Sequence, residues 1–490
     1  MDAAKATEPM LQIQTVKDVE NNKPKVKTID DFVELGWYTL FVSLTCELGI
    51  LAQVYNVMFM VFAGASPKVV GCGDSVSNNT NWCSNLAELR QQTNCTPKLN
   101  YQFYSVNIEF DRLCSDSIDV KNSISIQMLG VLLGASVTGQ ISDAIGRKPT
   151  MILCTLAMIL FGYLSLLANT LVVFTVWRFI IGLFCGGHTV VLYVYMLEQI
   201  PQKHRFWIAG VVNWAPNYFI IAATAYFSYN WRTFTKAICI IEIPAVICLI
   251  LLQESPRWLM QKGKFSAAKK TIMKMRLGMH NSPETELEVS RMIDSEAEKR
   301  SAQKPPKQRY VYHLFSSKKL AIYALTLGYG YFLTSIVNYG LMFNLAAISG
   351  SIYWNLAIIG LFRWIINILA GVVDLTLKNA EKEWHLFLRY STLAAAAFTS
   401  QGYITKNVVV VELFPTAIRN IANSFMGVTS RVGSMFAPQL FNLASIWFLL
   451  PYVALLTMTM IELTAFQVFI PETKFAKMTD HIESKKKTSN

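Results

Sequence analysis

The chain has 490 residues, of which 53% are hydrophobic and 16% charged, and its formal net charge is +12 at pH 7. Its mean hydropathy is +0.34, and its apolar blocks of about 20 residues are long enough to cross a hydrocarbon core as helices, which excludes an ordinary soluble protein. Many Lys and Arg residues lie beside those blocks. That placement is typical of cytosolic loops and argues against a nucleic-acid-binding protein.

The first half of the chain predicts six membrane-spanning helices. Residues 1–35 are expected in the cytosol, and no cleavable signal peptide is expected because residues 1–30 lack a short apolar core. The spans are expected at 36–62, 122–141, 150–168, 171–195, 207–228 and 233–252. All are helical in period or continuously apolar, without strand alternation, so residues 36–252 are expected to form one helical bundle.

Four of the nine cysteines lie in the polar loop 64–121, together with two glycosylation sequons. The cysteines are Cys72, Cys83, Cys95 and Cys114, and the sequons begin at Asn78 and Asn94. This combination predicts an extracellular, oxidised loop with two disulfides in one of three possible pairings. A zinc site is the alternative, but the loop has no Cys-x-x-Cys pair and no histidine.

The second half begins after a basic central loop at 253–318, which is expected in the cytosol. Apolar runs follow at 320–345, 351–375, 385–411, 421–445 and 447–470. Residues 319–473 are therefore expected to form a second helical bundle, and residues 474–490 a basic tail.

A short signature, E-x-x-P-x-x-x-R, occurs at matching places in the two halves. One copy runs from Glu198 to Arg205 and the other from Glu412 to Arg419. Each copy is followed, two apolar runs later, by another short motif with an acidic residue. This motif contains Glu254 and Arg257 in the first half and Glu472 in the second. An internal repeat of spanning helices is typical of transporters whose substrate site lies between the halves.

The predicted cytosolic turn between the second and third spans carries glycines and charges. Its main residues are Gly139, Asp143, Gly146, Arg147 and Lys148, and Asp374 stands where the second half would repeat it. Glycines allow close helix contact and a sharp turn, and the charges can meet a neighbouring helix end or carboxylate. We expect these groups to hold the two bundles closed on the cytosolic side; a plain turn with positive-inside charges is the alternative.

These motifs together resemble the major facilitator superfamily and, within it, the organic cation/carnitine/organic anion transporter family. The resemblance covers nearly the whole chain and includes, besides the glycosylated loop, residues 139–148, 178–182, 198–205, 231–232, 254–259, 339–341, 349–353, 412–420, 430–433, 437–438 and 471–474. It implies an all-α, polytopic membrane protein of two pseudo-symmetric bundles. It also implies transport by alternating access, without a cofactor.

The chain departs from the family pattern at several places. Gln253 stands where the family usually has Pro, Arg363 and Ile365 stand where it has an acidic residue and Pro, and the turn after Asp374 lacks its Gly-Arg. Asp143 and Glu198 are 55 positions apart, whereas Asp374 and Glu412 are only 38 apart. The shortfall is close to one spanning helix of about 20 residues.

We therefore expect eleven spans rather than twelve, with the ninth helix missing near 379–384. Eleven spans from a cytosolic start would leave 412–419 and the basic tail outside, against the positive-inside bias. A rearranged second half is one explanation; a splice variant or a faulty gene model is the favoured one.

Charged residues inside spans are costly and usually mark function or a paired structure. Those found here are Glu47, Arg178, Glu242, Arg363, Lys406, Arg431 and Glu462. Arg431 is the strongest candidate for a substrate contact, because the resembled family tends to have an acidic residue here in cation carriers and a basic one in anion or carnitine carriers. Arg363 adds a second deep guanidinium, which can hold a carboxylate with two hydrogen bonds. Pairing of either Arg with Glu242, Glu462 or a backbone carbonyl is the alternative.

The other candidate site residues are less specific. Glu47 and Glu242 are possible charged contacts, and the aromatic residues Tyr339, Tyr353, Trp354 and Trp214 are possible linings for a cation or an apolar ligand body. Plain packing is the alternative for each aromatic side chain. Arg178 belongs to a structural motif of the resembled family, and Lys406 is expected to extend to the interface from a span end.

The function expected from the sequence is transport of a small organic ion: a cation, a carnitine-like zwitterion or an anion. The alternative is a truncated, transport-inactive variant. An enzyme is not expected, because no nucleophile–His–acid grouping, H-E-x-x-H motif or phosphate loop is apparent. The expected partners are the small ion and the lipid bilayer, with no metal, cofactor or nucleic acid, and the expected location is the plasma membrane.

Overall fold

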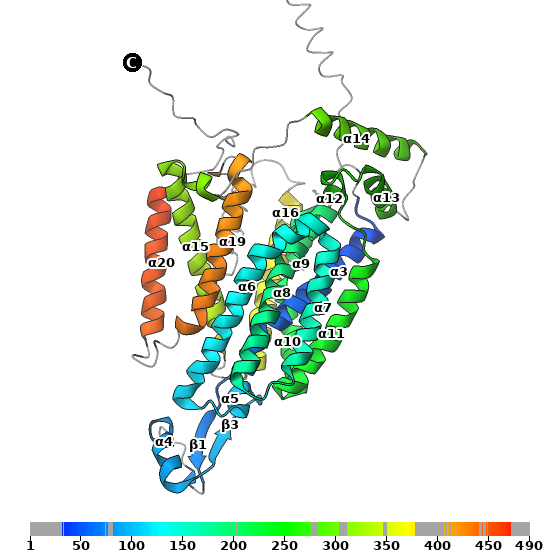
Figure 1. The fold of residues 1–490 in the computed structure, drawn as a ribbon. Coiled ribbons are helices and arrows are strands. Elements are labelled where there is room, and N and C mark those ends of the chain that lie inside the picture. Colours follow the sequence, from blue (N-terminus) through cyan, green and yellow to red (C-terminus); the bar gives the residue numbers. More distant parts are fainter. Residues whose placement is uncertain are drawn as a thin grey trace, which may run out of the picture.

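The computed structural model describes residues 32–471, apart from 33, 74, 77–81, 202–203, 277–282, 303–310, 346–349, 378–405, 407–408, 411–412, 415, 441–442, 444–446 and 448. In this part of the chain, long helices run between two ends of the molecule (Figure 1). The small sheet lies at one end, and α12 (Pro256–Gln261), α13 (Phe265–Met275) and α14 (Pro283–Ala302) lie at the other. We refer to these as the extracellular and cytosolic ends, following the orientation expected above.

The helices form two bundles. The first contains α3 (Trp37–Ala63), α6 (Ser117–Ile145), α7 (Arg147–Ser165), α8 (Leu171–Gln199), α9 (Arg205–Val211), α10 (Trp214–Ser228) and α11 (Trp231–Leu251). The second contains α15 (Lys318–Phe343), α16 (Ile352–Leu377), α19 (Thr416–Leu440) and α20 (Leu450–Phe469); of these, α16 packs mainly against α9 and α10 of the first bundle. Among the described residues, nine helical segments are long and apolar enough to cross a membrane.

Some observed bounds differ from the expected spans. The predicted span 207–228 is interrupted between α9 and α10, where the Asn213 side chain accepts a hydrogen bond from the N–H of Ala215 at 2.7 Å and caps α10. The predicted span 421–445 is observed as α19, which begins and ends five residues earlier. The predicted span 385–411 lies outside the described residues except for 406 and 409–410.

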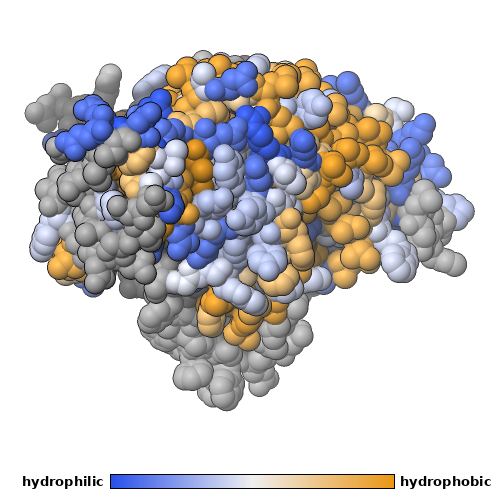
Figure 2. All heavy atoms as spheres, turned by 90° about the horizontal axis from the view of Figure 1, so that it is seen from below, coloured by the Kyte–Doolittle hydropathy of each residue, from blue (hydrophilic) through white to orange (hydrophobic). Residues whose placement is uncertain are grey.

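Large apolar side chains cover the flanks of the bundles. On α7, Leu153, Leu156 and Leu160 are exposed at helical spacing, and Ile240, Ile243 and Ile247 repeat this pattern on α11. Figure 2 shows hydrophobic residues along the flank and a more hydrophilic central area at the extracellular end. Exposed apolar stripes of this kind fit a surface that faces lipid rather than water.

Close packing of α6 against α8 organises the first bundle. A Cβ atom at Gly134 would lie 1.7 Å from the carbonyl oxygen of Leu183, and one at Gly186 would lie 2.1 Å from that of Val131. Only glycine permits the two backbones to approach this closely. The glycines therefore fix the distance between the helices on which the first bundle is built.

The second bundle pairs α15 with α19 in a parallel orientation. Gly328 faces Phe425 and Gly433 faces Phe332, so the contacts advance in the same direction along both helices. Both helices begin at the cytosolic end (Figure 1). The end of α16 and the start of α19 lie at this same end, whereas eleven spans would place 412–419 at the opposite end. The predicted junction near 379–384 lies outside the described residues.

The loop 64–121 forms a small extracellular module. Strands β1 (Lys68–Cys72), β2 (Ser75–Val76) and β3 (Pro97–Asn100) form an antiparallel sheet in the order β2-β1-β3, beside α4 (Trp82–Thr93). Disulfides join Cys72 to Cys95 and Cys83 to Cys114. These cysteines are therefore not free to bind zinc. Asn94 is exposed after α4, whereas Asn78 lies outside the described residues, and glycosylation of both remains a prediction.

The module is anchored on the first bundle. Glu109, in α5 (Val106–Glu109), forms an ion pair with Arg232 at 2.6 Å. Asn107 donates hydrogen bonds to the carbonyl oxygens of Gly64 and Ala65 at 2.9 and 3.2 Å. The short helix η1 (Cys114–Asp116) then leads into α6.

The central cytosolic loop carries helices rather than a plain linker. Helices α12, α13 and α14 share a small core that contains Trp258, Ile272, Val289 and the N-terminal Phe32. Arg276 pairs with Glu34 at 2.8 Å and donates to the carbonyl oxygen of Phe32 at 3.1 Å. The short helix η3 (Val311–Phe315) precedes α15. The loop thus holds the segment that leads into α3.

Candidate functional site

Two arginines of the second bundle lie beside one face of α15. Arg363, on α16, donates a hydrogen bond to Asn338 Oδ1 at 2.7 Å. Arg431, on α19, lies with its Nη1 atom 3.4 Å from the Tyr339 hydroxyl. Both guanidinium groups belong to half-buried residues. Because Asn338 and Tyr339 are neighbours on α15, the structure brings the two predicted arginines to the same part of the bundle.

The first bundle contributes an aromatic ring to this place. The Arg363 Cζ atom lies 5.8 Å from the centroid of the Tyr218 ring on α10. At Gly360, α16 approaches α10 so closely that a Cβ atom would lie 2.7 Å from Tyr218 Cβ. Arg363, Arg431, Tyr339 and Tyr218 thus form a group contributed by both bundles, which we call the central site.

The arginines of the central site have no acidic partner in the described part of the chain. No Asp or Glu oxygen there lies within 4.0 Å of the Arg363 or Arg431 guanidinium. Glu242 instead accepts a hydrogen bond from Asn56 at 2.6 Å, and Glu462 forms an ion pair with Lys406. The alternative in which these carboxylates neutralise the two arginines is therefore not observed.

Lys406 is held inside the second bundle and does not extend to the interface as expected. It donates to the Gly330 carbonyl oxygen at 2.7 Å and to Thr334 Oγ1 at 2.6 Å, and its charge is paired with that of Glu462. The Lys406 and Glu462 side chains are 13% and 17% exposed. Because an isolated buried charge is costly, this pair is best described as a structural contact.

Buried polar groups inside the first bundle form a second network. Arg178 Nε donates to Gln127 Oε1 at 3.0 Å, Arg178 Nη2 donates to the Asn56 carbonyl oxygen, and its guanidinium lies 4.3 Å from the Phe59 ring centroid. Asn56 in turn contacts Glu242. Arg178 therefore joins helices within one bundle, in agreement with the structural role implied for it. Glu242, predicted as a substrate contact, belongs to this network instead of the central site.

Glu47 lies next to the central site. Its Oε1 atom accepts a hydrogen bond from Asn217 at 2.8 Å, and Asn217 directly precedes Tyr218 on α10. Glu47 Oε2 and Asn217 Oδ1 are buried without a hydrogen-bond partner among the described residues. Sequence reasoning missed Asn217, Tyr218 and Asn338. These residues carry polar groups inside apolar runs, which could have marked them in the sequence, but the sequence does not show which helix face they occupy.

The remaining predicted aromatic residues do not join the central site. Trp354 is 67% exposed on the outside of the bundle. The Tyr353 hydroxyl donates to the Gln102 carbonyl oxygen at 2.8 Å at the extracellular end. Trp214 is half-buried at the first residue of α10 and packs against the main core. The Trp354 side chain therefore lies away from the central site, and Tyr353 contacts the extracellular module.

The predicted cytosolic turn forms around Gly146. Its φ of 121° lies in the region that favours glycine, and it connects α6 to α7. Arg147 is buried and pairs with Asp143 and, at 3.7 Å, with Glu198. Glu254 accepts hydrogen bonds from the backbone N–H groups of Arg147 and Lys148 at 3.2 Å, so its carboxylate lies at the N-terminus of α7.

Burial raises the pKa of the Glu254 carboxyl, and the N–H groups of Ser255, Lys148 and Arg147 oppose that effect. The Lys148 ammonium donates to the carbonyl oxygens of Ile250 and Leu252, both at 2.7 Å. These partners all belong to the first bundle and its junction with α12. Among the described residues, the turn joins helices of the first bundle to one another. The expected contact with the second bundle involves residues whose side chains lie outside the description, so it stays a prediction.

The other members of the repeated motifs are partly described. Arg205 donates to the Ile200 carbonyl oxygen at 3.1 Å, and Arg257 is in α12. Gly139 has open space around its Cβ position, so it provides no close contact. Asp374 and Arg419 lie in α16 and α19 with side chains outside the description, and Glu412 and Glu472 are outside the described residues.

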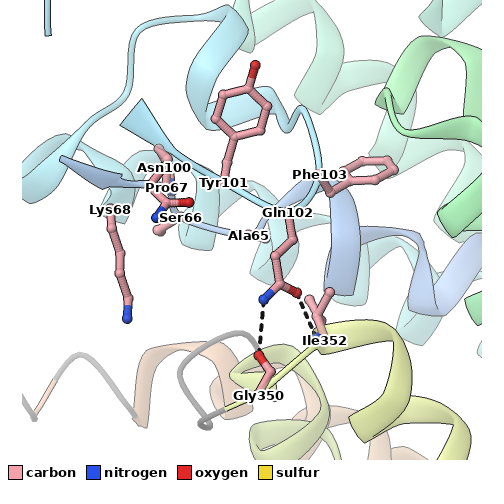
Figure 3. A pocket seen from close by; sticks show the side chains of 10 residues that line it. All are labelled: Ala65, Ser66, Pro67, Lys68, Asn100, Tyr101, Gln102, Phe103, Gly350 and Ile352. Carbon is pink, nitrogen blue, oxygen red and sulfur yellow. Dashed lines mark hydrogen bonds between the residues drawn. The ribbon is translucent and has the colours of Figure 1, made fainter. Parts of the chain in front are cut away.

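A pocket of about 170 Å³ opens between the extracellular module and the second bundle (Figure 3). Its lining comes from residues 65–68 and 100–103 on the module side and from Gly350 and Ile352 at the start of α16. The Gln102 side chain crosses from one side to the other. The pocket therefore marks the place where the two bundles meet at this end.

Comparison with known families agrees with this architecture. The profile of the family "Sugar (and other) transporter" matches residues 43–377, which is more than half of the chain. Solved structures of the xylose transporter XylE share the fold. The inward-open form from E. coli superposes with a TM-score of 0.59 at 14% identity, covering 90% of this chain and 98% of that chain. The proton:xylose symporter bound to a bromodeoxyglucose gives 0.57 at 17% identity, covering 89% and 96%.

Curated relatives define the family more narrowly. The chain is 30% identical over 439 residues to the organic cation transporter protein of Drosophila melanogaster, which covers 83% of this chain and 77% of the relative. It is 25% identical over 434 residues to the organic cation/carnitine transporter 2 of Rattus norvegicus, covering 81% and 75%. Solute carrier family 22 member 16 of Bos taurus is 25% identical over 387 residues, covering 74% and 67%.

These relatives are transporters and not enzymes, and the family together with the long apolar helices indicates that this chain is a multi-pass membrane protein. The chain belongs to the organic cation/carnitine/organic anion transporter family of the major facilitator superfamily.

Proposed function

We propose that the protein carries a small organic anion, or a zwitterion with a carboxylate, across the membrane by alternating access. The observation that supports this most strongly is the pair of guanidinium groups, Arg363 and Arg431, that have no acidic partner among the described residues. Two such charges repel an organic cation and attract a carboxylate, to which a guanidinium can donate two hydrogen bonds.

The position of the central site fits this mechanism. Arg363 and Arg431 come from the second bundle, while Tyr218 comes from the first. A ligand held between them contacts both bundles, so rocking of one bundle against the other can expose it to either side. Tyr218 and Tyr339 offer aromatic faces to the apolar body of the ligand, and Glu47 with Asn217 offers a polar edge beside it.

The names of the relatives are compatible with this choice. One is named for organic cations and another for organic cations and carnitine, a zwitterion with a carboxylate. The deep charge at Arg431 favours the carboxylate-bearing substrates over simple cations. The disulfide-linked module and its sequon at Asn94 support location in the plasma membrane, because both are typical of a protein surface exposed outside the cell.

Uptake by cells that display the protein at their surface tests the proposal. Labelled p-aminohippurate, carnitine and tetraethylammonium serve as anionic, zwitterionic and cationic probes. We expect saturable uptake of the anion or the zwitterion and none of tetraethylammonium. Arg431→Asp replaces charge-assisted hydrogen bonds, each contributing about 1.5–3 kcal/mol, with repulsion, so uptake should fall at least about tenfold.

The matched control reverses a charge at the surface. Lys262 is exposed at the end of α12, and Lys262→Asp should leave uptake unchanged. Surface-expressed protein that is inert toward all three probes would favour the truncated, transport-inactive alternative. Anion uptake that survives Arg431→Asp would remove Arg431 from the site.

A further inference from the structure

The segment that contains Gln102 is fixed to the first bundle on both sides. It follows β3, which pairs with β1 and is held there by the disulfide between Cys72 and Cys95. Phe103 is buried against Phe62 and Phe234, with ring centroids 5.9 and 6.0 Å apart. The segment around Gln102 therefore moves with the first bundle.

Tyr104 continues this attachment through its backbone. Its N–H donates to the carbonyl oxygen of Tyr229 at 2.9 Å, and its own carbonyl oxygen accepts from the N–H of Trp231 at 3.2 Å. Tyr229 and Trp231 lie at the turn between α10 and α11. The Gln102 segment is thus joined by hydrogen bonds to the extracellular ends of two transmembrane helices.

The side chain of Gln102 reaches across to the second bundle (Figure 3). Its Nε2 atom donates to the Gly350 carbonyl oxygen at 3.0 Å, and its Oε1 atom accepts from the Ile352 N–H at 2.9 Å. A carboxamide offers a donor and an acceptor side by side, so it satisfies both backbone groups at the start of α16 at once. A side chain without both functions cannot replace it.

Tyr353 strengthens the same junction. Its hydroxyl donates to the Gln102 carbonyl oxygen at 2.8 Å, and its ring stacks on Phe62 of α3 with centroids 5.5 Å apart. A second bridge lies at the other contact between the bundles, where Gln439 of α19 donates to Asn122 Oδ1 at 2.9 Å and Ser125 Oγ at 3.1 Å of α6. Asn122 and Ser125 lie in the extracellular half of α6.

We propose that Gln102 is a gating residue, whose carboxamide ties the extracellular module to the start of α16 and holds the extracellular mouth closed. Opening toward the outside then requires its two hydrogen bonds to α16 to break. The module is a strap between the bundles: Phe103 and Tyr104 hold it on the first bundle, and Gln102 binds the second bundle. This inference rests on the alternating-access mechanism proposed above, and it names a residue that sets how often the outer mouth opens.

Labelling of a buried reporter cysteine tests the strap without any substrate. Leu356 is fully buried on α16, on the same face as Tyr353 and Gly360. A membrane-impermeant thiol reagent applied from outside should label Leu356→Cys slowly. Adding Gln102→Leu removes two hydrogen bonds, each of modest net strength, and should raise the labelling rate about five- to thirty-fold. Gln439→Ala should raise it independently.

The matched control is Gln91→Ala, because Gln91 is exposed on α4 of the same module. It should leave the labelling rate of Leu356→Cys unchanged, and protein without the reporter sets the background from the native cysteines. Equal rates in the Gln102→Leu and Gln91→Ala backgrounds would overturn the proposal.

A second variant covers the case in which Gln102→Leu does not reach the cell surface. Gln102→Glu keeps the size and the acceptor but places a carboxylate against the Gly350 carbonyl oxygen, so it should also raise the rate, and an unchanged rate would again refute the strap. Because labelling needs no transported ion, failure of every uptake assay would leave this result standing.

Discussion

Replacement of Gly146 by Ala tests whether the cytosolic turn is built as the structure shows. Gly146 has φ 121° and ψ 159°, a backbone conformation that is essentially restricted to glycine. A Cβ atom there would also lie 2.4 Å from Glu254 Oε2. The substitution therefore strains the backbone and pushes a carboxylate away from the N-terminus of α7.

The size of the effect follows from these two contributions. A side chain in this conformation costs on the order of 1–3 kcal/mol. Glu254 accepts from the N–H groups of Arg147, Lys148 and Ser255 at 2.8–3.3 Å, and hydrogen bonds to a charged group contribute about 1.5–3 kcal/mol. Glu254 is half-buried and its carboxylate can shift, so only part of the second amount is lost. We expect Gly146→Ala to lower the free energy of unfolding by about 2–4 kcal/mol.

The assay is the apparent melting temperature of the detergent-purified protein, followed by size-exclusion chromatography after heating. Gly146→Ala should melt several degrees below the parent. Gly139→Ala is the control in the same motif, because the Cβ position of Gly139 on α6 is open and alanine favours a helix over glycine by about 1 kcal/mol. If Gly146→Ala melted like the parent, the geometry assigned to Gly146 would be refuted.

Three further substitutions are expected to lower the same melting temperature. In Gly134→Ala the Cβ atom would lie 1.7 Å from the Leu183 carbonyl oxygen, so α6 and α8 must separate at a cost of about 1–3 kcal/mol or more; unchanged melting would contradict the close packing. Lys406→Met leaves the partly exposed Glu462 carboxylate without its ion-pair partner, at a cost of up to about 3–5 kcal/mol. The double variant Lys406→Met/Glu462→Gln should recover part of that loss, and the absence of any recovery would argue against the ion pair. Gln253→Pro removes the N–H that donates to the Tyr38 hydroxyl at 3.2 Å, which should cost about 1 kcal/mol; a gain in stability would show that this bond is not needed.

The sequence predicts the class of fold because its strongest signals are local. Apolar runs of spanning length, four cysteines beside sequons and a glycine followed by Arg-Lys each need only neighbouring residues to be recognised. Gly146 and Arg147 belong to the predicted cytosolic turn, and Glu198 and Glu254 belong to two other sequence motifs; in the structure these residues meet. The disulfide pairing remained open because spacing alone does not determine it.

The central site could be predicted only in part, because helix faces decide it. Arg363 and Arg431 stand out in the sequence as charges in apolar runs, and both lie beside α15. Trp354 follows Tyr353 directly, yet Trp354 is exposed outside the bundle and Tyr353 contacts the extracellular module. Successive residues of a helix are about 100° apart, so small errors in phase exchange the inner and outer faces.

The pairing of buried charges is the second feature of the central site that the sequence alone does not determine. Glu242 and Glu462 were equal candidates to neutralise the arginines, since the sequence does not say which helices are neighbours. Asn56 binds Glu242 and Lys406 binds Glu462, which leaves the two guanidinium groups of the central site without an acidic partner among the described residues. Only the packing of the helices shows this.

Counterflow in proteoliposomes is the most direct test of the central claim, that this chain moves an organic anion or zwitterion by alternating access. Vesicles that contain the purified protein are loaded with unlabelled p-aminohippurate or carnitine, and labelled substrate is added outside. A carrier that exposes one site to each side in turn predicts a transient accumulation of label above its equilibrium level, which Arg431→Asp abolishes. Label that enters no faster than into protein-free vesicles, with either substrate, would contradict the account.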